Sequence, residues 1–171
     1  ALMAEAARLA ETDARAGDLL HGLDSVRAVN VFSWPSKAPA HDLSNALAVA
    51  PREQIYTSLG GNTPQWQINE AAERIHDGDL KLVLIAGAEC VYSARRARAK
   101  GVDLGGAPRG NPAPNAGDTR PGVNEAEAKH GATLPTAVYP LFENALRSHY
   151  GRGLDAHRQA LGELFAPFTD V

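Results

Sequence analysis

Gly60, Gly61, Asn62 and Thr63 form the pattern in this sequence that best fits a binding site. They separate a β-rich segment, residues 54–59, from a helical pattern. The first N–H groups of a helix lack intrahelical partners and carry a partial positive charge, and glycines let a ligand approach the backbone. This turn therefore predicts a place for an anion or a developing oxyanion. The alternative is that the two glycines only form a tight turn between strand and helix.

The common phosphate-binding motifs do not match this turn. No Gly-Lys-Ser or Gly-Lys-Thr follows it, as a Walker loop requires, and the glycine spacing is not that of the Gly-x-Gly-x-x-Gly dinucleotide fingerprint. A flavodoxin-like phosphate site that uses the Gly60 turn stays open as a hypothesis independent of any family.

Glu89 and Cys90 follow the apolar run of residues 80–86. In open α/β sheets the carboxyl ends of the strands border the ligand crevice, so both side chains are expected near that edge. A nucleophilic thiol needs a base, a cation or a helix N-terminus beside it. Cys90 precedes a basic helical segment, but the sequence identifies no base, which favours a small buried thiol. Glu89 is interpreted as a hydrogen-bonding partner rather than an acid catalyst.

The histidines and arginines give less specific patterns. The six histidines show no spacing typical of metal ligands, so no metal site is predicted. Arg95, Arg96 and Arg98 could attract a phosphate, but a run of charges on a helix is more often a solvated face.

The elements that position these residues alternate between helix and strand. We predict helices over residues 2–16, 39–49 and 63–77, and strands over residues 25–32, 54–59 and 80–86. In the third helix, Ile68, Ala71, Ala72 and Ile75 form the apolar stripe expected to face the core. The continuous apolar run of the third strand is typical of a strand covered on both faces. The predicted fold class is α/β, with a doubly wound, mostly parallel sheet.

The second half of the chain has a different character. Residues 101–122 contain six glycines and four prolines, which predicts a long loop. Helical patterns return over residues 125–130, 141–150 and 154–165, and we interpret them as a helical annex.

Composition limits the class of protein. The chain has 171 residues, 44% of them hydrophobic and 22% charged, which fits a globular protein and excludes a wholly disordered or coiled-coil chain. A formal net charge of −3 argues against a nucleic-acid binder that relies on a large basic face. The single cysteine excludes an intrachain disulfide and favours a reducing, cytoplasmic setting. No membrane span and no signal peptide are expected.

Several segments resemble the thiolase superfamily. Residues 55–65, with the sequence Ile-Tyr-Thr-Ser-Leu-Gly-Gly-Asn-Thr-Pro-Gln, and residues 79–89 are similar to its N-terminal half. Residues 135–146 and 154–171 are similar to its loop domain. The likeness is to the acetyl-CoA acetyltransferase branch, near the sterol-carrier-protein thiolases. It implies a partial N-terminal α/β domain over residues 1–100 and a Gly/Pro-rich loop with a helical loop-domain segment over residues 101–171.

The sequence departs from the superfamily at the place of the nucleophile. In thiolases a catalytic cysteine opens the helix after the third strand, and the matching position here is Gly60. Cys90 lies a whole helix and strand later and does not match that cysteine. The superfamily's Gly-His-Pro histidine, its second cysteine and its first strand have no counterpart in these 171 residues. The resemblance therefore implies an internal piece of a thiolase-like protein that is inactive by itself.

The resemblance implies that the protein binds an acyl-CoA thioester and needs no metal. Gly60, Gly61, Asn62 and Thr63 would form one wall of the pocket, with Glu89 at the strand edge and Tyr139 on the side of the CoA. Two alternatives remain open: a cysteine-independent retro-aldol lyase on a CoA-linked substrate, and a non-catalytic acyl-CoA or lipid-binding module. A homodimer or a small partner subunit is the expected assembly.

Overall fold

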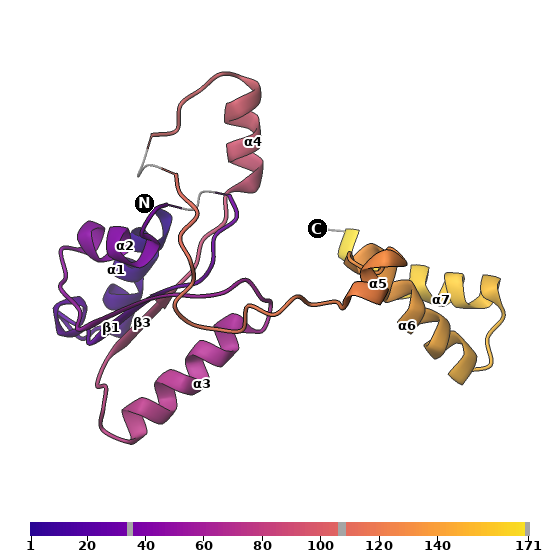
Figure 1. The fold of residues 1–171 in the computed structure, drawn as a ribbon, viewed down its shortest axis with the longest axis horizontal. Helices are drawn as coiled ribbons and strands as arrows, with labels where there is room; N and C mark the ends of the chain where they lie inside the picture. The colour runs from indigo at the N-terminus through magenta and orange to yellow at the C-terminus, as the bar shows by residue number, and fades with distance from the viewer. Residues whose placement is uncertain (34–35, 106–108, 170–171) are drawn as a thin grey trace. The chain divides into compact units, whose positions relative to one another are not determined.

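A computed structural model describes residues 1–33, 36–105 and 109–169 of the chain. It divides into two compact units, Ala1–Thr119 and Arg120–Val171 (Figure 1). The resemblance placed the domain boundary after residue 100, and the compact units divide 19 residues later. Each unit is described below by itself.

The first unit is built on a three-stranded parallel sheet. Its strands are β1 (Ser25–Ala28), β2 (Glu53–Tyr56) and β3 (Val83–Ala86), in the order β2-β1-β3. Ser25 lies opposite Glu53 on one side and Val83 on the other. The predicted α/β class with a parallel sheet is confirmed, although all three strands are shorter than the sequence patterns suggested.

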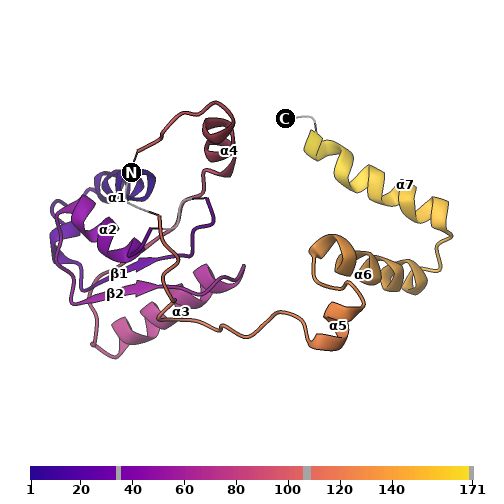
Figure 2. The ribbon, with the colours of Figure 1, turned by 45° about the horizontal axis from the view of Figure 1, so that its top comes forward.

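Helices cover both faces of this sheet. The helix α2 (Pro39–Leu47) connects β1 to β2, and α3 (Thr63–His76) connects β2 to β3. Because these two crossovers run in opposite directions across the sheet, right-handed connections require their helices to lie on opposite faces. Figures 1 and 2 show this arrangement, with α1 (Leu2–Ala14) beside α2 and α3 across the sheet. The sheet is therefore doubly wound, as predicted.

The apolar core lies on the α1 and α2 face. It also takes in the short 3-10 helix η1 (Leu20–Gly22). The buried side chains that pack together here are Ala4, Ala7, Leu20, Leu23, Val26, Leu43 and Leu47. The face of the sheet that α1 and α2 cover is thus held by burial of apolar side chains.

The α3 face is polar, which contradicts the predicted orientation of this helix. The most buried residues of α3 are Thr63, Gln67 and Ala71. Ile68 and Ile75 of the predicted core stripe are 50% and 42% exposed. The reason lies in the sheet, because the side of β1 that meets α3 presents polar side chains.

The central strand β1 is the most buried strand of the sheet, whereas the apolar run of residues 80–86 was expected to be covered on both faces. Every residue of β1 is buried, including Ser25 and Arg27, both at 0% exposed. The residues of β3 are only partly buried. The prediction failed because position in the sheet, which the sequence did not give, decides how much of a strand is covered.

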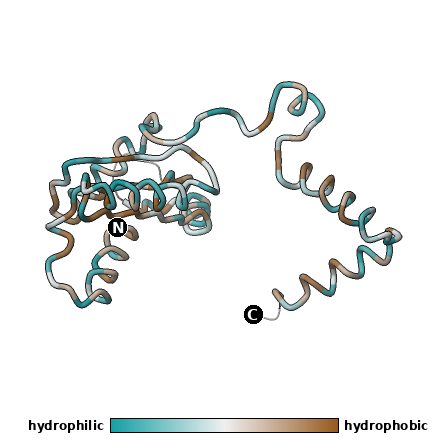
Figure 3. The backbone as a smooth tube through the Cα atoms, turned by 90° about the horizontal axis from the view of Figure 1, so that it is seen from below, coloured by the Kyte–Doolittle hydropathy of each residue, from teal (hydrophilic) through white to brown (hydrophobic). Residues whose placement is uncertain are grey.

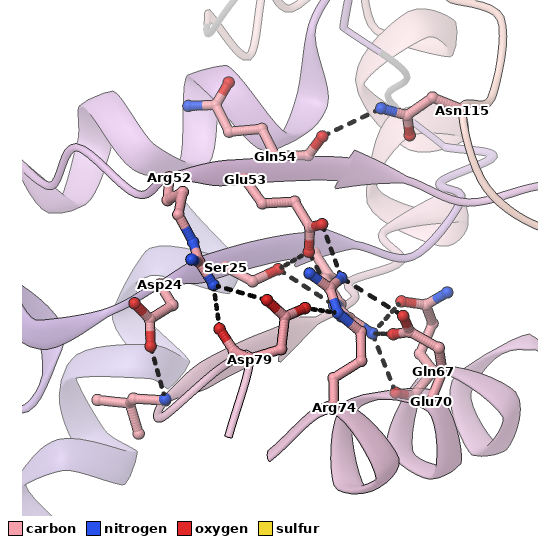
Figure 4. A network of polar contacts seen from close by, with 12 residues as sticks. Asp24, Ser25, Arg52, Glu53, Gln54, Gln67, Glu70, Arg74, Asp79 and Asn115 are labelled. Atoms are coloured by element: carbon pink, nitrogen blue, oxygen red, sulfur yellow. Dashed lines mark hydrogen bonds and ion pairs between the residues drawn. The ribbon is translucent and has the colours of Figure 1, made fainter. Parts of the chain in front are cut away.

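A network of ion pairs and hydrogen bonds joins Glu53 of β2 to Glu70 and Arg74 of α3 (Figure 4), and the buried Arg27 guanidinium belongs to it. Arg27 Nε donates to Ser25 Oγ (3.1 Å), and Nη1 donates to Gln67 Oε1 (3.1 Å) and to the Glu70 carboxylate. Arg27 Nη2 lies 3.4 Å from Glu53 Oε1. The buried charge is thus shared between two carboxylates, one on β2 and one on α3, as burial of a charge requires.

Arg74 extends the same network to the end of α3. Its Nη1 donates to Glu53 Oε2 (2.7 Å) and its Nε donates to Asp79 Oδ2 (2.8 Å). Hydrogen bonds from Arg74 to Glu53 and Asp79 raise the pKa of the Arg74 guanidinium. Partial burial of Glu53 raises its pKa, but hydrogen bonds from Arg74 and Ser25 outweigh this effect and leave that pKa below its ordinary value.

The Gly/Pro-rich segment after the helix α4 (Val91–Ala99) packs on the first unit. Asn115 and Tyr56 exchange hydrogen bonds, since Tyr56 N donates to Asn115 Oδ1 (2.8 Å) and Asn115 N to Tyr56 O (3.0 Å). Gly117 has a positive φ of 103°, and a Cβ there would lie 2.2 Å from Ser58 Oγ. This pairing along the outer edge of β2 explains why the first unit extends to Thr119.

The second unit consists of the helices α5 (Glu125–Lys129), α6 (Pro135–His149) and α7 (Leu154–Phe165), followed by the 3-10 helix η2 (Ala166–Thr169). The helix α6 begins six residues before the predicted start at residue 141. It therefore contains Pro140 in its interior. Hydrophobic and hydrophilic positions alternate along α6 and α7 (Figure 3), and many large apolar side chains of this unit are exposed. His157 Nε2 and Glu143 Oε2, 3.0 Å apart, join the two helices.

Replacing the buried arginine tests the role of the network. Arg27→Met removes the fully buried cation and leaves Glu53 and Glu70 with Arg74 alone, so we expect the free energy of unfolding to fall by about 3 kcal/mol in a urea titration. Arg52→Met is the matched control, because the Arg52 and Asp79 side chains are both more than half exposed. The control should cost less than about 1 kcal/mol. Equal losses for the two variants would contradict this account.

The lowered pKa of Glu53 predicts how stability depends on pH. A carboxyl whose pKa is lower in the folded state adds stability above its unfolded pKa of about 4.3 and loses it as the pH falls through the folded value. We expect the melting temperature to drop below pH 4.3, and to drop less in Glu53→Gln than in the parent. Glu73→Gln, at an exposed position of α3, should keep the parent's profile. A Glu53→Gln profile parallel to the parent's would refute this assignment.

Candidate functional site

The turn between β2 and α3 lies at the carboxyl edge of the sheet. Thr63, 4% exposed, fixes the turn from the helix side. Its N–H donates to Gly60 O (3.1 Å) and its Oγ1 to Ser58 O (3.4 Å). These two bonds close the backbone of residues 58–63 on itself.

The two glycines of this turn have different reasons to be glycine. A Cβ on Gly60 would lie 2.9 Å from Asn62 Oδ1 and 3.0 Å from Thr63 Oγ1, so a side chain there would disturb the turn. A Cβ on Gly61 would meet nothing within 4 Å. Gly60 therefore serves the tight turn, whereas Gly61 leaves open space at the start of α3.

The start of α3 offers few free amides. The Thr63 N–H is bonded within the turn, and Trp66 N donates to Asn62 O (3.0 Å). Pro64 has no N–H. Among the residues that the structure describes, no hydrogen-bond partner is found for the Gln65 amide, so in the first turn this N–H and the partial positive charge of a 14-residue helix face a ligand. This is a narrower donor set than the sequence pattern alone suggested.

Asn30 and Thr57 tie the end of β1 to the end of β2. Asn30 N donates to Thr57 Oγ1 (3.0 Å), and Asn30 Nδ2 donates to Thr57 O (3.3 Å). Thr57 is fully buried. The sequence analysis missed both residues, because neither lies in a motif and only the sheet order brings them together.

Glu89 ties the end of β3 to the loop that follows β1. Its carboxylate accepts hydrogen bonds from the backbone N–H groups of Phe32 (2.5 Å) and Ser33 (2.9 Å). Partial desolvation raises the Glu89 pKa, but the bonds from Ser33 and Phe32 outweigh it and lower that pKa overall. Glu89 is thus an ionised group with a structural task at the predicted edge.

Cys90 stands directly before α4, at its N-cap position. Cys90 N donates to Ser33 Oγ (2.8 Å), and the Sγ of Cys90 lies 3.4 Å from the same oxygen. Among the described residues, the hydrogen-bond contact of this thiol is thus with a hydroxyl, which is no general base for a nucleophile.

The predicted residues divide between the two units. Residues 60–63 and Glu89 lie at the carboxyl edge of the sheet in the first unit. Tyr139 belongs to α6 in the second unit, where it is 63% exposed and packs against Phe142, with ring centroids 6.3 Å apart. Arg95 and Arg98 of α4 line a cavity of about 660 Å³ together with Phe32. Arg95 and Arg98 thus lie beside the loop after β1, whose Phe32 and Ser33 N–H groups donate to Glu89.

The described residues contain no group of three or more histidine, cysteine, aspartate or glutamate side chains that could hold a metal ion. In the same part of the chain, no helix has the length and apolar character needed to cross a membrane.

Comparison with known proteins identifies the fold. No protein-family model matches the sequence, and no curated protein matches it. Among solved structures, the chain is similar to a monomeric SCP2-thiolase like protein type 1 from Mycobacterium smegmatis, with a TM-score of 0.63 and 24% sequence identity. The fold is thiolase-like. The match covers 99% of this chain but only 30% of the other, so the chain spans less than a third of that protein's length.

This match supports the resemblance stated from the sequence at the level of the fold. It covers the α/β unit and the helical segment, which the sequence assigned to a partial thiolase fold with a helical annex. The branch within the superfamily, the acyl-CoA ligand and the roles of the site residues are separate questions.

Proposed function

We propose that this chain is part of a thiolase-like, acyl-CoA-binding protein of the acetyl-CoA acetyltransferase type. The observation that carries the proposal is the thiolase-like fold over 99% of the chain, with the Gly60 turn and the start of α3 at the carboxyl edge of its sheet. This edge is where open α/β sheets bind ligands. The protein is proposed to work in the cytoplasm.

In this proposal the thioester carbonyl lies against the start of α3. The open space beside Gly61 admits the acyl group, and the Gln65 amide and the positive end of α3 face the carbonyl oxygen. Asn62 and Thr63 shape the wall. Arg95 and Arg98 supply cations for the phosphates of CoA.

The chemistry follows from the residue at the nucleophile position. Gly60 has no side chain, so no acyl-enzyme can form there and Claisen condensation through this position is excluded. This favours a second candidate, a cysteine-independent retro-aldol lyase on a CoA-linked substrate, which would work with a small partner subunit or as a homodimer. A binding module without turnover is the third possibility.

Filling the space beside Gly61 tests the binding site. We expect Gly61→Val to weaken acetyl-CoA binding about tenfold, which is ~1.4 kcal/mol, in isothermal titration calorimetry. Gly17→Val is the matched control, because a Cβ on Gly17 also meets nothing within 4 Å and Gly17 lies outside the site. Unchanged affinity in Gly61→Val, with binding by the parent, would place the ligand elsewhere.

Intact mass spectrometry after incubation with acetyl-CoA tests the missing nucleophile. We expect no covalent acetyl adduct, since Gly60 offers no nucleophile and Cys90 has no base beside it. Cys90→Ser is the control for any adduct that forms. An acetyl group on the parent that is absent from Cys90→Ser would show that Cys90 is the acyl acceptor and would overturn this assignment.

A further inference from the structure

A second cavity, of about 270 Å³, lies among the starts of α1 and α2 and the loops that follow β1 and β3. Its walls include Met3 of α1, Leu43 of α2, Val31 after β1 and Cys90 after β3. None of residues 60–63 lines it. It is therefore a different place from the proposed thioester site.

The size and lining of this cavity suit a small aliphatic molecule. At roughly 30 Å³ for each water-sized group, the volume holds about nine such groups. Most of the wall is apolar, with side chains such as Leu2, Val31, Leu43 and Leu104. Asp42 is the acidic side chain in the wall, and its carboxylate disfavours an anionic ligand.

Ser36 is a residue of the cavity wall whose hydroxyl can hydrogen-bond to a ligand. Ser36 is 7% exposed, and its Oγ is buried with no hydrogen-bond partner among the residues that the structure describes. An unpaired buried hydroxyl is costly, and such groups in native proteins are normally bonded. A bridge to Arg109 holds the backbone of Ser36, and Ser36 is one of the residues that line the cavity.

We propose that this cavity binds a small, uncharged aliphatic alcohol or ketone, with the ligand oxygen on Ser36 Oγ and the alkyl chain along α1 and α2. A hydroxyl can both donate and accept, so Ser36 pairs with either class of oxygen. Cys90, whose Sγ lies 3.4 Å from Ser33 Oγ, is in the wall beside the ligand.

The sequence supplies two single-copy reporters for this cavity. Cys90 is the only cysteine and Met3 the only methionine of the chain, and both line the cavity. Cys90 can be labelled with methyl methanethiosulfonate, in which the thiolate attacks the sulfenyl sulfur, a disulfide forms and methanesulfinate leaves. The Met3 methyl group gives a single carbon-13 signal.

The test is a titration with 1-hexanol at fixed pH. We expect hexanol to slow Cys90 labelling at least threefold in a saturable way and to shift the Met3 methyl signal over the same concentration range. Ser36→Ala should weaken the hexanol affinity about fivefold, the size of one lost hydrogen bond. Ala46→Phe, which fills the cavity from α2, should abolish both responses.

Asn45→Phe is the matched control, because Asn45 is an exposed neighbour on α2 that does not line the cavity. It should retain both responses. Circular dichroism verifies that each variant is folded, and the conservative Ser36→Ala keeps the test decisive should Ala46→Phe fail to fold. Absence of both responses in the parent, or identical affinity in the parent and Ser36→Ala, would overturn the proposal. The hexanol titration contains no CoA, so a negative result in it would not count against the proposed acyl-CoA binding at the Gly60 turn.

Discussion

The buried guanidinium of Arg27 is the interaction on which the arrangement of the first unit depends. It lies at 0% exposure in the central strand and bonds to side chains of β1, β2 and α3 at once. A buried cation must be paired, so the helix that crosses this face has to present Gln67 and Glu70 to the sheet. This requirement fixes the rotation of α3 about its own axis. It also explains why Ile68 and Ile75 face outward, against their apolar periodicity.

The same constraint positions the candidate site. With α3 held along its length by Arg27 and at its end by Arg74, its first turn is fixed against the carboxyl end of β2. Asn30 and Thr57 join the ends of β1 and β2, and Glu89 joins the end of β3 to the loop after β1. The edge that is proposed to hold the thioester is thus built from backbone groups with satisfied hydrogen bonds, a rigid support for a ligand.

The two faces of the sheet have separate physical characters. The α3 face is held by charge, while the α1 and α2 face holds a hydrophobic core and the small cavity beside Cys90. Glu89 and Cys90, neighbours in sequence, both bond to Ser33 but have different tasks. The Glu89 carboxylate fixes the loop at the strand edge, and the Cys90 thiol faces the cavity.

The sequence by itself determined the α/β class, the alternation of helices and strands, the turn at residues 60–63 and the likeness to thiolases. The class, the alternation and the turn follow from local signals, namely apolar periodicity, prolines at helix starts and glycines at turns, whereas the likeness to thiolases is a resemblance carried by segments such as residues 55–65 and 79–89. Only the tertiary structure decided that β1 is the central strand, that Arg27 is buried and that α3 packs by its polar side. Asn30 and Thr57 are 27 residues apart in the sequence, and they are in contact because β1 and β2 are neighbours in the sheet. Strand order and helix rotation depend on which distant groups must neutralise one another, and the spacing of neighbouring residues does not encode that.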